Sequence, residues 1–227
     1  MAQEVFSRKE KKYILSPHEQ QDLLTLVEPY LKKDRYFKGT NCSIYFDTKD
    51  WYLLMRALEK PLYREKVRLR SYGTPKLSDT VFLEVKKKFN GIGSKRRVPV
   101  KLSDFYSYLN GGKLMTDNPQ IAAEIDYCFK QYKLKPMIMI AYDRLSYCGK
   151  DDAKFRVTFD YNVRGRINNL QLEQGDQGRS YFKNGEIVME VKSLHGYPIW
   201  FTQALSKLKL YPASFTKYGR VTMDLIN

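Results

Sequence analysis

Cations at every second position of one short segment limit what this chain can fold into. The segment is YREKVRLRSY, residues 63–72, in which Val67 and Leu69 stand between charged neighbours. The cations are Arg64, Lys66, Arg68 and Arg70. Because side chains alternate across a β-strand, the segment is predicted to be a strand with one apolar and one cationic face. A lone charged face is usually solvated, so its meaning depends on the rest of the chain.

Further strands are predicted at residues 6–15, 41–47, 80–89, 95–100, 137–147, 154–163 and 186–194, and all of them except 41–47 mix apolar and cationic positions. The cations on the predicted strands include Lys12, Arg68, Arg70, Lys86, Lys95, Arg97, Arg144, Arg156 and Lys192. If the sheet closes, their side chains converge on a lumen. Like charges at such a density need a polyanion or counter-ions between them.

Three predicted strands also carry a Glu-x-Lys step, which places a carboxylate and a lysine on one face. The steps are Glu10–Lys12, Glu84–Lys86 and Glu190–Lys192. Each glutamate can offset the charge of nearby cations. Alternatively, it can hold a divalent metal ion, because hard cations favour carboxylate oxygens and share them with phosphate.

Helices are predicted between the strands from capping residues and apolar spacing. Ser16, Pro17 and Glu19 mark a helix start, with Ser16 as the N-cap and Glu19 completing a capping box; this helix is predicted to end near Pro29. The other predicted helices are residues 50–59, 102–112, 118–134 and 198–210. No low-complexity linker divides the sequence, so residues 1–227 are predicted to form a single α+β domain rich in antiparallel strands.

The charge balance predicts a polyanionic partner. The chain has 40 Lys and Arg against 25 Asp and Glu, a formal net charge of +15, which suits nucleic acid, an acidic membrane or a phosphate compound. Only two histidines argue against a Ser/His/Asp triad or a histidine-rich zinc site. Three distant cysteines favour a reducing compartment, and no segment has the pattern of a membrane span or signal peptide. We therefore expect a cytoplasmic protein.

Short pieces in a fixed order carry a family resemblance. They are SIYFDT, KVRLRSYG, FLEVKKK followed by SKRR, AYDRLSY, FRVTFD and MEVK, within a span from FSRKEKKYIL to SFTKYGRV. In this order they resemble the VTC domain, the polyphosphate-polymerising branch of the triphosphate tunnel metalloenzymes. The resemblance implies a closed tunnel of eight antiparallel β-strands with helices packed outside.

The resemblance also implies roles for individual residues. Its catalytic residues would be Lys12, Arg68, Arg70, Lys86, Arg144, Arg156 and Lys217. Further phosphate contacts would come from Arg56, Lys95 and Arg97, and we add Lys66 and Lys192 because they stand on the cationic faces. Glu190 matches the metal-binding glutamate, and Glu10 and Glu84 are further candidates for holding Mn²⁺ or Mg²⁺.

Tyrosines on the predicted strands could stack on an adenine. The candidates are Tyr13, Tyr45, Tyr72 and Tyr142. Aromatic residues on strands more often pack in the core, so each candidate stands against that simpler reading.

Three features depart from the family pattern. The related hydrolases carry E-x-E-x-K on the first strand, whereas here Arg8 holds the first glutamate position. Ser214 replaces a lysine three residues before Lys217, which bears on polymerase rate and chain-end handling. No regulatory or membrane domain is evident, so such parts would come from a membrane-protein partner chain, with this chain peripheral at the inner face of the membrane.

The predicted function is a metal-dependent polyphosphate polymerase that transfers the γ-phosphoryl group of ATP to a polyphosphate chain. Phosphoryl transfer needs mainly positioning and charge stabilisation, which arginines and lysines supply. One alternative is hydrolysis of tripolyphosphate or a nucleoside triphosphate in the same tunnel. Another is a non-catalytic sensor of polyphosphate or other polyanions. Nucleic acid is not an expected partner, because its binding proteins normally place their cations on an open surface.

Overall fold

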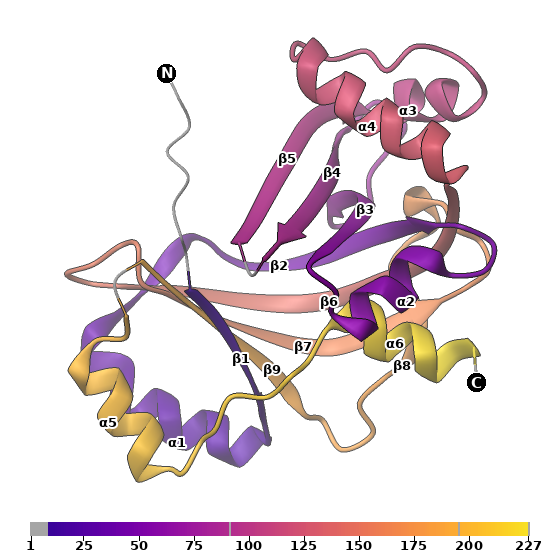
Figure 1. The fold of residues 1–227 in the computed structure, drawn as a ribbon. Coiled ribbons are helices and arrows are strands. Elements are labelled where there is room, and N and C mark those ends of the chain that lie inside the picture. Colours follow the sequence, from indigo (N-terminus) through magenta and orange to yellow (C-terminus); the bar gives the residue numbers. More distant parts are fainter. Residues whose placement is uncertain (1–8, 91, 195, 227) are drawn as a thin grey trace. The chain divides into compact units, whose positions relative to one another are not determined.

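A computed structural model describes residues 9–90, 92–194 and 196–226 (Figure 1). The strands are β1 (Lys9–Leu15), β2 (Leu31–Asp47), β3 (Tyr63–Tyr72), β4 (Thr80–Phe89), β5 (Ile92–Lys101), β6 (Lys135–Gly149), β7 (Arg156–Arg166), β8 (Arg179–Ser180) and β9 (Ile187–Ser193). The helices are α1 (Pro17–Val27), α2 (Tyr52–Glu59), α3 (Leu102–Leu109), α4 (Pro119–Tyr132), α5 (Ile199–Lys207) and α6 (Lys217–Ile226). Two short 3₁₀ turns cover Glu28–Tyr30 and Leu172–Gln174. Arg8 and the predicted strand residues 6–8 lie outside the described residues.

The sheet differs from the predicted eight-stranded closed tunnel. Its order is β1-β9-β7-β6-β2-β3-β4-β5, and the ninth strand, β8, pairs with β7 beside this path. A closed barrel requires a hydrogen-bonded register between the first and last strands of the path. Among the described residues the path ends at β1 and β5, so hydrogen bonds do not close the sheet. The extra strand has two residues, too few to show an alternating pattern in the sequence.

The chain divides into two compact units, each with its own hydrophobic core. Unit 1 contains the residues up to Thr40, Tyr142–Val163 and Ser180–Thr216. Unit 2 contains Asn41–Ala141, Arg164–Arg179 and the residues from Lys217. The strands β2, β6, β7 and β8 contribute to both units. That residues 1–227 form a single domain stays a prediction.

In unit 1, the helices α1 and α5 lie side by side against the apolar side of the strands (Figure 1). Val157 of β7 is fully buried in this core together with Leu23 of α1 and Phe201 of α5. The predicted helix start is confirmed: the Ser16 hydroxyl accepts a hydrogen bond from the Glu19 N–H at 3.2 Å, and the Glu19 carboxylate accepts one from the Ser16 N–H at 2.8 Å. This capping box sets the first turn of α1.

In unit 2, the apolar face of β3 packs under α3 and α4. Val67 and Leu69 are fully buried in a core that includes Phe105 of α3 and Ile125 of α4. The bounds of β3 and β4 agree with the predicted residues 63–72 and 80–89. Their apolar side chains therefore face the helices, which leaves the charged positions on the opposite side of the strands.

Besides β8, the sequence pattern missed the first part of one strand and one whole helix. The strand β2 begins at Leu31, ten residues before the predicted 41–47, because LKKDRYFK has no regular alternation. The helix α6 was implied only by the family resemblance, because the last helix predicted from the sequence pattern ends at residue 210. No helix in the described ranges is long and apolar enough to cross a membrane.

Candidate functional site

The registers of unit 2 place six of the predicted catalytic or phosphate-binding cations on one face of β3, β4 and β5. Three rows of directly opposite residues run across these strands. They are Arg70–Phe82–Pro99, Arg68–Glu84–Arg97 and Lys66–Lys86–Lys95. Opposite residues in neighbouring antiparallel strands point to the same side of a sheet. We call this surface the cationic face; its cations are Arg64, Lys66, Arg68, Arg70, Lys86, Lys88, Lys95 and Arg97.

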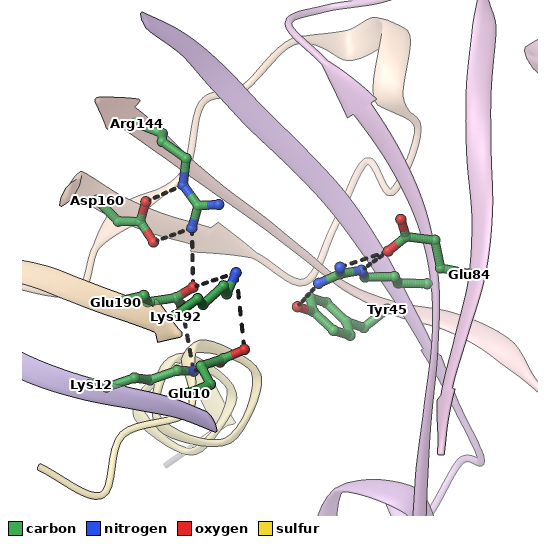
Figure 2. Close-up of polar contacts among 9 residues, drawn as sticks. Glu10, Lys12, Tyr45, Glu84, Arg144, Asp160, Glu190 and Lys192 are labelled. Atoms are coloured by element: carbon green, nitrogen blue, oxygen red, sulfur yellow. Dashed lines mark hydrogen bonds and ion pairs between the residues drawn. The ribbon is translucent and has the colours of Figure 1, made fainter. Parts of the chain in front are cut away.

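One carboxylate, Glu84, lies in the middle of the cationic face and is 1% exposed. The Arg68 Nε donates to its Oε2 at 2.7 Å, and the second guanidinium contact is 2.6 Å long (Figure 2). Lys95 and Arg97 form ion pairs with its Oε1 at 2.7 and 2.8 Å. Burial alone would raise the pKa of Glu84, but Arg68, Arg70 and Lys95 lower it to about 2. Glu84 is therefore an ionised anchor for three cations.

The two arginines at the centre of the face are held in fixed orientations. Arg68 also donates to the Tyr45 hydroxyl at 3.2 Å, and Arg70 donates through Nε to the Ser43 hydroxyl at 3.1 Å. Both partners stand opposite their arginine in the β2–β3 register. Neutral acceptors on β2 thus orient guanidinium groups without cancelling their charge.

A buried carboxylate, Asp47, connects this face to two helices. It accepts hydrogen bonds from the Leu53 and Leu54 N–H groups at 2.8 and 2.9 Å, which caps the start of α2. It also accepts from the Tyr218 hydroxyl of α6. The Tyr218 ring stacks on Tyr45, with centroids 4.5 Å apart and planes 10° apart. Asp47 therefore fixes the two helices that carry Arg56 and Lys217.

The remaining predicted residues of unit 2 lie around this centre. Lys217 is buried at the first position of α6. The Lys66 Nζ is 5.5 Å from the centre of the Tyr218 ring. Arg56 is half-buried near the end of α2, and Lys86 is exposed on β4. All eight predicted cations of unit 2 thus lie on β3, β4, β5, α2 or α6.

Unit 1 pairs its predicted cations with carboxylates. The β1–β9 register sets Lys12 opposite Glu190 and Glu10 opposite Lys192. Lys12 is 3.5 Å from Glu190 and 3.9 Å from Glu10, and Lys192 is 3.6 and 3.9 Å from the same two carboxylates (Figure 2). Cations and anions therefore alternate across β1 and β9, in contrast to the cationic face of unit 2.

Two aspartates that sequence reasoning missed complete this arrangement. Arg144 donates to Asp160 through Nε at 2.6 Å and through a terminal nitrogen at 2.8 Å, and it lies 3.4 Å from Glu190 (Figure 2). Arg156 pairs with Asp34, which also accepts from the Ser146 hydroxyl at 3.1 Å. Asp160 could have been found, because it follows Arg156 by four positions and so shares its strand face. Asp34 lies in the part of β2 that the pattern did not reveal.

Carboxylate oxygens suitable for a hard metal ion are present in unit 1. Glu10, Glu190 and Asp160 stand on β1, β9 and β7, and oxygen donors are the ligands that Mg²⁺ and Mn²⁺ prefer. As arranged, no three acidic, histidine or cysteine side chains of the described residues form a metal-holding group. The chemistry of Glu10 and Glu190 fits a metal, provided that they exchange their lysine partners for it. Glu84 fits less well, since three cations already occupy it.

The predicted convergence of both sets of cations on one lumen stays a prediction, as do the catalytic and binding roles. Tyr142, one of the aromatic candidates, is buried with its ring 5.2 Å from the Arg144 guanidinium. Tyr13 and Tyr45 are also buried, whereas Tyr72 is exposed at the end of β3.

Comparison with known proteins gives a family match and distant structural similarities. The profile of the VTC domain matches residues 7–225. A candidate adenylyl cyclase from Hippeastrum, whose structure is described as revealing a dominant triphosphatase activity, has a TM-score of 0.53 and 11% identity, with 95% of each chain covered. A candidate adenylate cyclase from Vibrio parahaemolyticus has a TM-score of 0.47 and 12% identity, covering 91% of this chain and 86% of the other. No curated protein matches.

Proposed function

Since the chain belongs to the VTC domain family, we propose that it is a metal-dependent polyphosphate polymerase. A terminal oxygen of a polyphosphate chain attacks the γ-phosphorus of ATP, and the bond from that phosphorus to the β,γ-bridging oxygen breaks. ADP leaves with the electron pair of that bond, and the chain is one phosphate longer. The structural similarity to a protein described as a triphosphatase concerns the fold, at 11% identity, and is compatible with this proposal.

The cationic face of unit 2 is the observation that carries the proposal. Glu84 is the one carboxylate among the eight cations of this face on β3, β4 and β5, so the surface has a large surplus of positive charge. Arginine can bind two phosphate oxygens at once, and lysine acts as a point charge. Glu84 and Tyr45 hold Arg68 in one orientation, which reduces the entropy that phosphate binding costs.

In this proposal the residues of unit 1 handle the divalent metal. When bound, Mn²⁺ or Mg²⁺ supplies charge neutralisation at the phosphate oxygens. Glu190 and Glu10 would hold it, and Lys12 and Lys192 would then be released toward phosphate oxygens. Arg144 is anchored by Asp160 and Arg156 by Asp34, so their guanidinium groups are positioned before substrate arrives.

Hydrolysis of a triphosphate is the second candidate function. It uses the same cations, with water in place of the terminal oxygen of the chain. The dominant triphosphatase activity reported for the Hippeastrum protein favours keeping this candidate, as does Ser214 at a position where the polymerase pattern has lysine. The proposal also includes a membrane-protein partner and a position at the inner face of a membrane. Identifying the proteins that bind this chain in cells tests both.

One experiment separates the candidates. The purified protein is incubated with γ-labelled ATP, Mn²⁺ and a short polyphosphate primer, and the products are sized on a gel. Labelled chains longer than the primer are expected. Labelled orthophosphate alone would replace the polymerase with a hydrolase. If the protein binds polyphosphate without metal and shows no turnover when Mn²⁺ or Mg²⁺ is added, its function would be that of a sensor. Omitting the metal and omitting the primer are the controls.

A further inference from the structure

Tyr72 differs from the other tyrosines that could stack on a base. Tyr13, Tyr45 and Tyr142 are 2%, 7% and 4% exposed, so their rings are committed to packing. Tyr72, at the last position of β3, is 61% exposed. A ligand can therefore reach the ring of Tyr72 without rearrangement of the core.

The exposed ring of Tyr72 is nevertheless held in place. Its hydroxyl accepts a hydrogen bond from a terminal nitrogen of Arg97 at 2.7 Å. The ring meets Phe82 of β4 edge to face, with centroids 5.7 Å apart and planes 66° apart. The Arg97 guanidinium lies 3.8 Å from the centre of the Phe82 ring. Two contacts thus fix the ring of Tyr72, and the Arg97–Phe82 contact joins its two partners, so stacking of a flat ligand on the ring costs little entropy.

The position of Tyr72 relates it directly to the cationic face. It follows Arg70 by two residues, and Phe82 is the partner of Arg70 in the β3–β4 register. Along β3 the same side then carries Arg70, Arg68, Lys66 and Arg64, with neighbours about 6.8 Å apart at ~3.4 Å per residue. One end of the face is thus aromatic, and the remainder is cationic. A nucleoside triphosphate has the same division between its base and its phosphates.

We propose that Tyr72, supported by Phe82 and Arg97, binds the nucleobase of the phosphoryl donor. The phosphates of the donor then extend from Arg70 along β3 toward Arg64, which gives the bound nucleotide a direction. This inference rests on the proposed function only in taking a nucleoside triphosphate as the donor. Because the contact is a stack and the Tyr72 hydroxyl is engaged by Arg97, adenine and guanine nucleotides bind with similar affinity.

The test compares a ligand that has a base with one that lacks it. Titration calorimetry without divalent metal measures the dissociation constants of ATP and tripolyphosphate for wild type, Tyr72→Ala and Tyr72→Phe. Tyr72→Ala is expected to weaken ATP binding about 5- to 150-fold, the range for one base–aromatic stack, and to change tripolyphosphate binding less than about twofold. Tyr72→Phe keeps the ring and is expected to retain most of the affinity for ATP.

A matched control is available on a helix of the same unit. Tyr127 of α4 is 64% exposed, and Tyr127→Ala is expected to change neither dissociation constant. An equal loss of ATP and tripolyphosphate binding in Tyr72→Ala, or no loss of either, would overturn the nucleobase site and leave the proposed function intact. Failure of wild type to bind tripolyphosphate would instead count against the proposed function itself.

Discussion

Glu84→Gln tests how far a single carboxylate sustains the cationic face. Glutamine keeps the size of the side chain and removes its charge, which leaves Arg68, Lys95 and Arg97 facing one another around a neutral group. Because Glu84 is buried, water cannot reach the site to solvate the cations that lose their partner. We expect a lower free energy of unfolding at neutral pH, together with a smaller dependence of that free energy on acid.

The size of the effect follows from the lowered pKa of Glu84 and from the usual cost of breaking a buried ion pair. Arg68 and its neighbours lower the pKa of Glu84 to about 2 from an ordinary 4.5, although burial alone would raise it. At about 1.4 kcal/mol per pH unit, this difference corresponds to ~3 kcal/mol of stability. Removing one partner from a buried ion pair typically costs about 3–5 kcal/mol, which agrees. A depressed carboxylate pKa contributes this stability above pH ~4.5 and loses it as the pH falls toward ~2.

Urea unfolding of wild type and Glu84→Gln between pH 7 and pH 2 measures both effects. The variant is expected to be less stable by ~3 kcal/mol at pH 7, and the two proteins should converge as the pH approaches 2. Glu59→Gln, at an exposed position of α2, is the control and should follow wild type throughout. A Glu84→Gln protein as stable as wild type at pH 7, or a constant difference down to pH 2, would refute the role of Glu84 as an ionised anchor.

Three other predictions concern binding, metal and helix anchoring. Arg70→Ala should weaken tripolyphosphate binding measured by calorimetry without metal. For wild type, a hundredfold excess of tripolyphosphate over its dissociation constant should add about 2.7 kcal/mol to the free energy of unfolding. No rise in the melting temperature of wild type at low salt would contradict the site. Glu190→Gln should reduce metal-dependent turnover by orders of magnitude while metal-free tripolyphosphate binding persists or strengthens, because a repulsive charge is gone; full turnover would remove Glu190 from the metal site. Tyr218→Phe should lower the free energy of unfolding by about 1.5–3 kcal/mol in urea, since Asp47 loses a donor while the ring still stacks on Tyr45; an unchanged midpoint would show that the hydroxyl does not anchor α6.

The sequence predicted those parts of the structure that depend on local periodicity. Alternating positions in β3 and an apolar run followed by lysines in β4 gave their bounds, and the Ser16–Glu19 capping box gave the start of α1. The first half of β2 was not predicted to be a strand, because its cations and aromatic residues do not alternate with a period of two. Strand periodicity is informative only where one face is buried.

The partners of the predicted cations could not be read in the same way. Nothing near Asp47 in the sequence indicates that it accepts a hydrogen bond from Tyr218, 171 positions away. The pairing of Asp34 with Arg156 likewise depends on contacts between strands far apart in the chain. The composition indicated a surplus of positive charge, whereas the strand registers show that it gathers on one face of β3, β4 and β5 and that cations stand opposite carboxylates on β1 and β9.

The even spacing of cations along β3 has a consequence for how a long substrate moves. A polymer of identical charged groups on a row of similar charges has several bound positions of nearly equal energy, so it can shift by one group without first dissociating. Each contact also displaces small anions from the surface. The binding free energy of the polymer is therefore largely entropic, and binding weakens as ionic strength rises. Along the row from Arg70 to Arg64 a polyphosphate chain would then slide while it stays bound. Moderate salt would speed this sliding, and higher salt would release the chain.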